Sequence, residues 1–127
     1  TCIEGGQLRF LHQNSLRFYE DISYDDTYNG LANSIEEGER IATGLGDKRI
    51  LFLGNHGVIV TGKTVAEAFD RLYYLERACQ VQVLAMSTGA PLKEISSNLA
   101  AITRKAFDTE SDYANRHFLA LKNLLEK

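Results

Sequence analysis

Residues 49–64 read RILFLGNHGVIVTGKT, and this stretch decides how the middle of the chain folds. Its second half, GVIVTGKT, satisfies G-x-x-x-x-G-K-[ST], the pattern of a P-loop whose backbone N–H groups wrap a nucleotide phosphate. The residues between its two glycines are Val58, Ile59, Val60 and Thr61. Four β-branched side chains in a row favour an extended backbone over a curled loop. We therefore expect a hairpin with arms 49–53 and 58–61 and the tip GNHG, and no nucleotide site at Lys63.

Two capping boxes flank this hairpin and predict the helices on either side of it. Residues 34–37 read SIEE and residues 64–67 read TVAE, so each has a Ser or Thr followed three residues later by Glu, as at a helix N-terminus. We expect the first helix to end at the glycines of GLG, residues 44–46. The second helix should be the longest, about 35 Å if it runs for roughly 23 residues. Its apolar stripe, at steps of three and four, consists of Val65, Ala68, Phe69, Leu72, Leu75, Cys79, Val83 and Met86.

The remaining pattern predicts helices rather than strands. Residues 8–22 are interpreted as a short helix with an irregular lead-in, and residues 23–34 as a long loop rich in Asp, Asn, Ser and Gly. After the helix breakers of GAP at residues 89–91, apolar spacing predicts two further helices, within 92–102 and 113–124. The hairpin arms are the two strands that we predict, and a two-stranded ribbon is not stable alone. We therefore expect the sheet to continue outside this sequence or in another subunit.

Composition places the chain among ordinary globular domains and excludes some partners. It has 127 residues, of which 44% are hydrophobic and 24% charged, so we expect one domain or part of one. A net charge of −3 with dispersed Lys and Arg predicts no nucleic-acid partner. The sequence has no run of eighteen apolar residues and no signal-peptide pattern, which predicts no membrane association. Two cysteines, Cys2 and Cys79, form no disulfide framework, and we expect a cytoplasmic location.

The histidines are the first candidates for chemistry. His117 lies on an apolar helix stripe and is best interpreted as a packing residue, as are Tyr73 and Tyr74. His12 has no supporting ligand nearby in the sequence. His56 differs because it lies at a hairpin tip, where an imidazole can project past the edge of a sheet. From the residues alone a solvated turn histidine is still favoured for His56, because a metal site needs three or four ligands and no others are within reach.

A longer stretch around His56 carries a resemblance to a known family. Residues 51–85 read LFLGNHGVIVTGKTVAEAFDRLYYLERACQVQVLA and resemble the C-terminal half of the class II aldolase/adducin domain family. Members share a strand, an N-H-G turn, a second strand, a G-x-T-[VP]-x-E-A-F helix start and an E-x-A continuation. Weaker similarity covers HQNSLRFYEDISYDD, EEGERIA and YANRHFLALKNLLEK. The resemblance implies a three-layer α/β/α fold with a mostly antiparallel sheet, of which residues 1–127 are the C-terminal portion of a truncated domain.

The same resemblance implies an activity and a role for His56. Family enzymes are metal-dependent lyases or epimerases that act on small sugar phosphates or related hydroxycarbonyl compounds of carbohydrate metabolism. They commonly use zinc, which can polarise a carbonyl oxygen, and the histidine of N-H-G is one of three that bind it. That histidine maps onto His56. Family enzymes usually form tetramers, so the resemblance also implies self-association into a homo-oligomer.

The rest of the family site has no counterpart in this sequence. In the family a His-x-His element and a catalytic acid lie upstream, and the resemblance implies that this sequence begins just after the His-x-His element. His56 is therefore the one metal ligand that we assign, and no catalytic or cofactor-binding residue is assigned. The fragment as such is expected to be inactive. The alternative is a non-catalytic, adducin-like scaffold domain, because such members use the same fold for assembly. The N-H-G turn does not discriminate between the two, whereas the upstream residues would.

Overall fold

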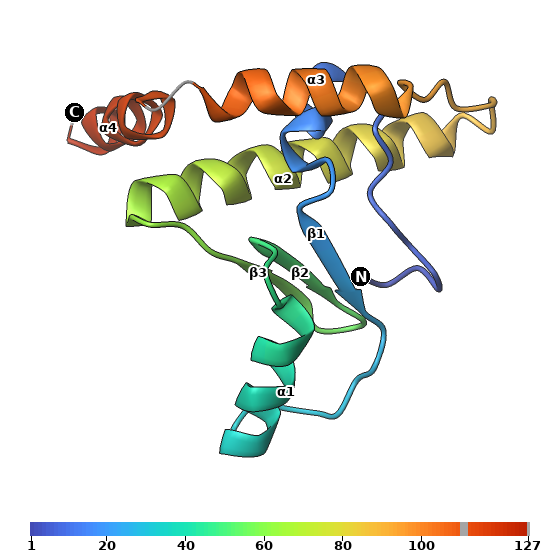
Figure 1. The fold of residues 1–127 in the computed structure, drawn as a ribbon, viewed down its shortest axis with the longest axis vertical. Coiled ribbons are helices and arrows are strands. Elements are labelled where there is room, and N and C mark those ends of the chain that lie inside the picture. Colours follow the sequence, from blue (N-terminus) through green and yellow to red (C-terminus); the bar gives the residue numbers. More distant parts are fainter. Residues whose placement is uncertain (110–111, 127) are drawn as a thin grey trace. The chain divides into compact units, whose positions relative to one another are not determined.

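A computed structural model of the protein describes residues 1–109 and 112–126. These residues form two compact units, Thr1–Gln7 with Glu20–Thr61 and Leu8–Tyr19 with Gly62–Lys127, which we call the sheet unit and the helical unit. The elements, in chain order (Figure 1), are η1 (Gln13–Phe18), β1 (Ile22–Asp25), α1 (Ile35–Leu45), β2 (Ile50–Leu53), β3 (Gly57–Val60), α2 (Val65–Ser87), α3 (Ser97–Asp108) and α4 (Tyr113–Leu125).

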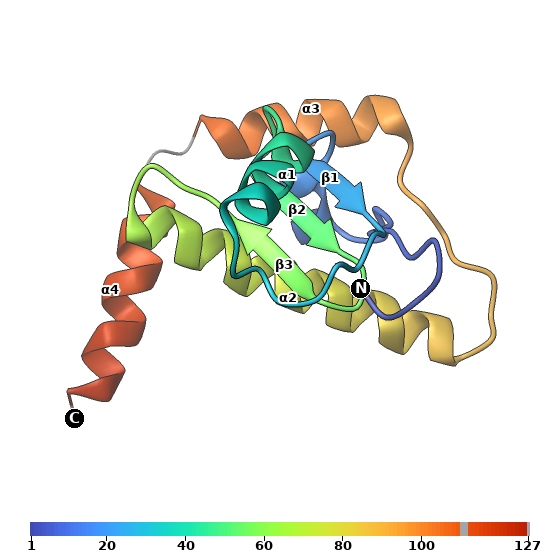
Figure 2. The same ribbon diagram turned by 90° about the horizontal axis from the view of Figure 1, so that it is seen from below.

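The sheet unit is a three-stranded sheet in the order β1-β2-β3, with α1 packed against β1 and β2 (Figure 2). β1 is parallel to β2, with Ile22 opposite Ile50, and β3 is antiparallel to β2, with Val60 opposite Ile50. The core of the unit lies on the central strand, because the side chains of Ile50 and Leu51 are fully buried. The hairpin that the sequence predicts around GNHG is confirmed.

Both predicted capping boxes begin a helix. The Ser34 hydroxyl accepts a hydrogen bond from the Glu37 N–H at 3.2 Å, and the Thr64 hydroxyl accepts one from the Glu67 N–H at 3.2 Å. α1 then ends at Leu45 and is followed by Gly46, whose positive φ of +58° is one that glycine adopts more readily than other residues. The starts of both helices and the glycine stop of α1 are therefore as predicted.

The prediction of one short helix with an irregular lead-in over residues 8–22, followed by a loop over 23–34, is wrong in part. Residues 26–34 form no helix or strand, as predicted, but the segment before them differs. Residues Gln13–Phe18 form a short 3-10 helix, and Ile22–Asp25 form strand β1. Between the two elements Glu20 has a φ of +59°, which a helix interior does not allow. β1 is stabilised by pairing with β2, which follows α1 in the chain. The spacing of residues within 22–25 does not indicate this pairing partner.

The segment that matches the P-loop pattern does not have P-loop geometry. Its first half is strand β3, whose backbone pairs with β2, and the Thr61 N–H donates to the Arg49 carbonyl at 2.9 Å. A Cβ atom at Gly62 would lie 2.6 Å from the backbone nitrogen of Ala68. Glycine at 62 therefore lets the chain pass close to the first turn of α2, and the pattern arises from a hairpin followed by a capped helix.

The helical unit packs its elements around α2. η1 contacts α2 and α3, and α4 contacts α2. Its buried apolar residues are Leu8, which precedes η1, and, from three of these elements, Leu16, Phe18, Ala66, Leu75, Ala78 and Ala100. Among the described residues, no helix has the length and apolar character that a membrane span requires.

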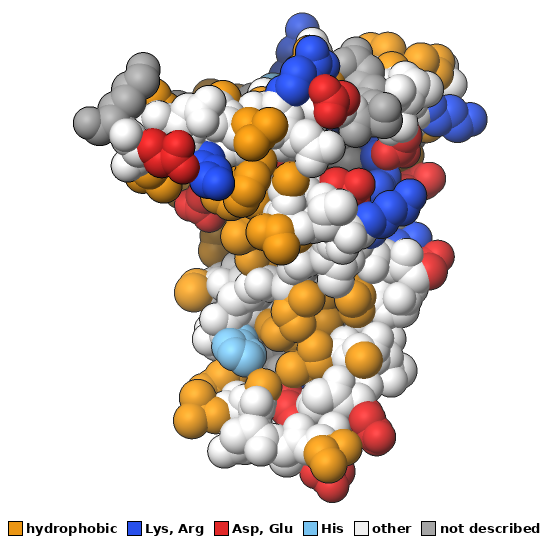
Figure 3. All heavy atoms as spheres, turned by 90° about the vertical axis from the view of Figure 1, so that its left-hand side faces the viewer, with side chains coloured by type: hydrophobic (Ala, Val, Ile, Leu, Met, Phe, Trp, Pro, Cys, Tyr) orange, Lys and Arg blue, Asp and Glu red, His pale blue; other side chains and the backbone are white. Residues whose placement is uncertain are grey.

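The face that α2 buries differs from the predicted apolar stripe. Of the eight predicted positions, Leu75 is buried, while the exposed ones are Val65, Phe69, Leu72, Val83 and Met86. The other buried positions of α2 are Ala66, Asp70 and Ala78. The small side chains of Ala66 and Ala78 allow neighbouring elements to approach α2 closely. Apolar periodicity does not indicate which side of a helix the neighbouring elements cover. Figure 3 shows apolar side chains exposed at several places on the face it presents.

Candidate functional site

His56 lies in the three-residue turn, residues 54–56, that connects β2 to β3. Its backbone N–H donates to the Leu53 carbonyl at 3.2 Å, which closes the turn. Asn55 has a φ of +55°, a left-handed conformation that asparagine tolerates better than most residues. The side chain of His56 is exposed, so the imidazole projects from the tip of the hairpin as predicted.

Two other segments hold the backbone of this turn. The Gly54 N–H donates to the Asp25 carbonyl at 2.8 Å, and the Asn55 N–H donates to the Thr1 carbonyl at 2.9 Å. A Cβ atom at Gly54 would lie 2.9 Å from the carbonyl oxygen of Asp26, closer than a real Cβ atom approaches backbone oxygen. Glycine at 54 is therefore required for the contact. His56 is exposed, yet the backbone that carries it is fixed.

Tyr28 lies against His56 from the loop that follows β1. The two ring centroids are 6.4 Å apart and the rings are inclined at 80°, an edge-on arrangement. The Tyr28 side chain is 54% exposed, so the pair sits at the surface of the sheet unit. The sequence predicts a loop at this position but carries no signal for the ring contact, since the two residues are far apart in the chain.

An ion-pair cluster anchors the start of the Tyr28 loop. The Thr27 N–H donates to Asp25 Oδ1 at 2.9 Å, and Arg40 of α1 pairs with the other Asp25 oxygen. Arg40 also donates two hydrogen bonds to Glu37, at 2.8 and 2.7 Å. The Thr27 N–H, and then the Arg40 guanidinium, lower the pKa of Asp25 because both favour the charged carboxylate.

The described residues do not complete a metal centre around His56. Within residues 1–109 and 112–126, no three or more His, Cys, Asp or Glu side chains lie close enough together to hold a metal ion. A zinc site of the family type needs three protein ligands, so His56 supplies one ligand at most from this chain. The assignment of His56 as a metal ligand stays a prediction.

A second polar cluster lies in the helical unit, and sequence reasoning missed it. The buried carboxylate of Asp70 accepts a hydrogen bond from Arg17 at 2.9 Å and lies 2.7 Å from Nδ1 of His117. The Arg17 guanidinium also lies over the ring of Tyr74, 3.9 Å from its centroid. His117 is thus a packing residue of α4, as predicted, but it also pairs with an acid. The sequence feature that could have revealed this cluster is the aspartate among the apolar residues of α2, since a buried acid requires a partner.

His12 and the two tyrosines add no further site. His12 is part of the cap of η1, and burial lowers its pKa because the charged imidazolium loses hydration. Tyr73 packs against His117 with ring centroids 4.7 Å apart, and Tyr74 lies 5.6 Å from the same ring. The interpretation of both tyrosines as packing residues agrees with these contacts.

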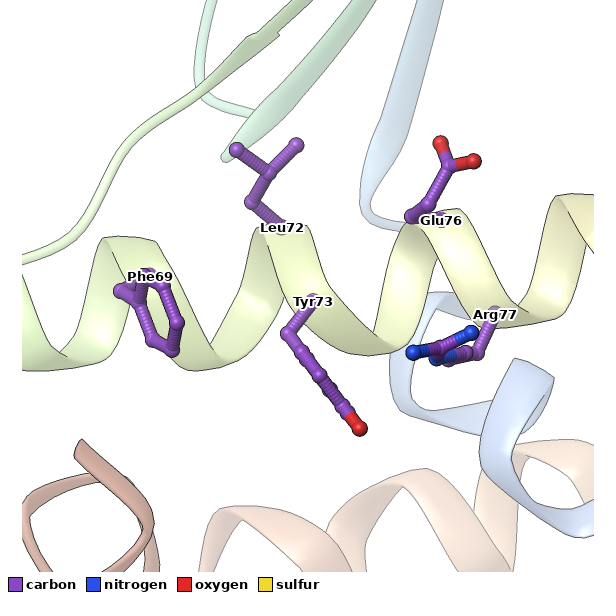
Figure 4. A pocket seen from close by; sticks show the side chains of 5 residues that line it. All are labelled: Phe69, Leu72, Tyr73, Glu76 and Arg77. Atoms are coloured by element: carbon purple, nitrogen blue, oxygen red, sulfur yellow. The ribbon is translucent and has the colours of Figure 1, made fainter. Parts of the chain in front are cut away.

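A groove on α2 is too small to be the leading ligand site. It has a volume of about 260 Å³ and is lined by Phe69, Leu72, Tyr73, Glu76 and Arg77 (Figure 4). Figure 4 shows Leu72 and Glu76 projecting from one side of the helix and Tyr73 and Arg77 from the other, so these polar groups do not converge. Small-molecule sites usually have volumes of about 300–1,000 Å³ and convergent polar groups. The His56 turn therefore remains the candidate site.

Comparison of the sequence with known proteins identifies relatives of two kinds. An aldolase class 2-type protein of Pseudomonas aeruginosa is 39% identical over 104 residues, which are 82% of this chain and 39% of that protein. Beta-adducin of Homo sapiens is 36% identical over 76 residues, which are 59% of this chain and 10% of adducin. The chain therefore spans well under half the length of these relatives.

Solved structures and a family model agree with these relatives. The crystal structure of an aldolase II superfamily protein from Pseudomonas syringae matches 98% of this chain and 50% of its own length, with a TM-score of 0.86 and 31% identity. This likeness shows the predicted α/β class II aldolase-like fold. The model described as Class II Aldolase and Adducin N-terminal domain matches residues 1–83. Because that match covers more than half of the chain, the protein belongs to the class II aldolase and adducin N-terminal domain family.

Proposed function

We propose that the protein is a metal-dependent class II aldolase-type lyase or epimerase in which His56 is one ligand of a divalent metal ion, preferably zinc. The observation that carries the proposal is the N-H-G turn, whose backbone is fixed by Asp25 and Thr1 while its imidazole is exposed. Neutral imidazole is a common zinc ligand, and a fixed backbone keeps such a ligand in place. The other ligands would come from residues outside this chain or from another subunit.

For the substrate we propose a small sugar phosphate or a related hydroxycarbonyl compound. This proposal is supported by an L-fuculose 1-phosphate aldolase from Glaciozyma antarctica PI12, which matches 81% of this chain and 37% of its own length. That match has a TM-score of 0.66 and 31% identity. We extend the proposal to a role in carbohydrate metabolism, which the same likeness supports. The proposed cytoplasmic location rests on cysteine content alone.

The second candidate function is a scaffold domain of the adducin type. It is favoured by the likeness to beta-adducin. Under this proposal the N-H-G sequence serves the geometry of the turn. Gly54 allows the close contact with Asp26, and Asn55 adopts the positive φ. His56 itself then has no chemical task.

Metal analysis separates the two functions. For residues 1–127 alone we expect weak zinc binding, because one imidazole lacks the multidentate geometry of tight zinc sites. In the protein together with any segment that its gene places upstream, we expect stoichiometric zinc and aldol-cleavage activity. His56→Ala should remove both without changing the circular dichroism spectrum, because His56 is exposed.

The matched control for this experiment is His12→Ala, which removes an imidazole remote in sequence from the N-H-G turn. It should leave the zinc content unchanged. If the longer protein contains no metal, or if His56→Ala retains as much metal as the wild type, the aldolase proposal is wrong and the scaffold proposal replaces it.

A further inference from the structure

We propose that Tyr28 is a positioning residue for His56, and that the edge-on contact between the two rings restricts the orientation of the imidazole. The inference rests on the proposed function in one respect, because the need for a fixed orientation follows from the role of His56 as a ligand. The restriction itself is a property of the free chain and is measured there.

The geometry of the pair is that of a favourable aromatic contact. Ring centroids 6.4 Å apart with planes at 80° lie within the range of edge-to-face pairs, about 4.5–7 Å. Tyr28 is 54% exposed and is not part of the core. The Tyr28 ring is the aromatic neighbour of the His56 imidazole among the described residues, and we assign the restraint to this contact.

The backbones on both sides of this contact are held in place. On one side, Gly54 packs against the backbone of Asp26, which a Cβ atom would prevent. On the other side, the Thr27 N–H donates to Asp25, and the positive φ of Gly30, +90°, turns the chain after Tyr28. Tyr28 therefore comes to His56 from a loop whose start is tied to the same turn.

A metal-binding histidine is usually oriented by a second partner, most often a hydrogen bond to its other ring nitrogen. At this turn the partner is an aromatic edge. An edge-to-face pair changes the ratio of side-chain orientations by about threefold to tenfold. Loss of the Tyr28 ring should change the ratio of His56 side-chain orientations by that factor. Phe should substitute for Tyr28, because the contact uses the ring and not the hydroxyl.

The direct test is NMR of the 127-residue chain and three variants. In Tyr28→Ala we expect the His56 ring resonances to move and its χ1 couplings to become averaged, while Tyr28→Phe keeps the wild-type values. The matched control is Tyr113→Ala, which removes a tyrosine of similar exposure, 49%, from α4, and it should leave His56 unchanged. Unchanged His56 couplings in Tyr28→Ala would overturn the inference.

A second arm distinguishes failure of this inference from failure of the proposed function. In the longer protein, zinc titration should give a dissociation constant about threefold to tenfold higher for Tyr28→Ala than for the wild type, with recovery in Tyr28→Phe. If wild-type protein binds no zinc, the proposed function is wrong, and the NMR result still decides whether Tyr28 orients His56. If zinc depends on His56 but not on Tyr28, the positioning role is wrong and the function stands.

Discussion

At the scale of single residues, Asp70 does more for the helical unit than its place in the sequence suggests. Its carboxylate is buried and pairs with Arg17 of η1 and His117 of α4, so one side chain connects three elements. Arg17 in turn lies over the rings of Tyr74 and Phe107. Removal of one partner from a buried pair leaves the other charge without compensation, which costs more than the pair itself contributes.

We therefore expect Asp70→Asn to lower the free energy of unfolding of the protein by about 3 kcal/mol, because it leaves Arg17 without its counter-charge at nearly constant volume. Urea denaturation measures the change. The matched control is Glu94→Gln, since the pair of Glu94 with Arg9 lies at the surface of the same unit and such pairs contribute at most about 1 kcal/mol. Equal losses in the two variants would contradict the role assigned to Asp70.

At the scale of elements, Arg40 connects α1 to the end of β1. It pairs with Asp25 of the strand and with Glu37 of its own helix. The pKa of Asp25 is lowered, first by the Thr27 N–H and then by Arg40. A carboxyl group whose pKa is lower in the folded state contributes stability above its unfolded pKa and loses it as the pH falls through the folded pKa.

For this reason Asp25→Asn should be less stable than the wild type near neutral pH, and the difference should vanish in acid once the wild-type carboxyl is protonated. Unfolding by urea at a series of pH values measures it. Arg40→Gln should reduce the same acid dependence, because it removes one of the two groups that lower the pKa of Asp25. A difference between Asp25→Asn and wild type that is constant from neutral to acid pH would show that this linkage is absent.

At the scale of the whole molecule, the exposed apolar residues bear on the predicted self-association. Large apolar side chains are exposed on the second half of α2, where Val83 is 55% and Leu84 is 61% exposed. Contiguous exposed apolar surface is typical of interaction sites. The three described strands also leave β1 and β3 as sheet edges, which proteins usually pair or cover.

We accordingly expect sedimentation to report a dimer or a larger species of the purified protein. Leu84→Lys should shift the distribution toward monomer, because it places a charge on the exposed apolar surface without disturbing the core. The control is Gln80→Lys, which adds the same charge to an exposed polar position of the same helix. A compact wild-type monomer at low micromolar concentration would contradict the expected self-association.

Local chemistry along the chain was enough to determine several features of this protein. The capping side chains of Ser34 and Thr64 bond to backbone three residues away, so the helix starts can be read from the sequence. The β-branched residues before Gly62 favour extended backbone by themselves, which separates the hairpin from a P-loop. The exposed position of His56 follows from the same turn.

Only the tertiary structure decided the features that depend on distant partners. β1 forms because β2 pairs with it, and the buried face of α2 depends on which elements cover it. The pairs Asp70–His117 and Tyr28–His56 join residues that lie on different elements, far beyond the reach of a helix turn or a hairpin. Hydrogen bonding within a helix turn or a hairpin is encoded by neighbours a few residues apart, whereas burial and side-chain pairing arise only when remote segments meet in space.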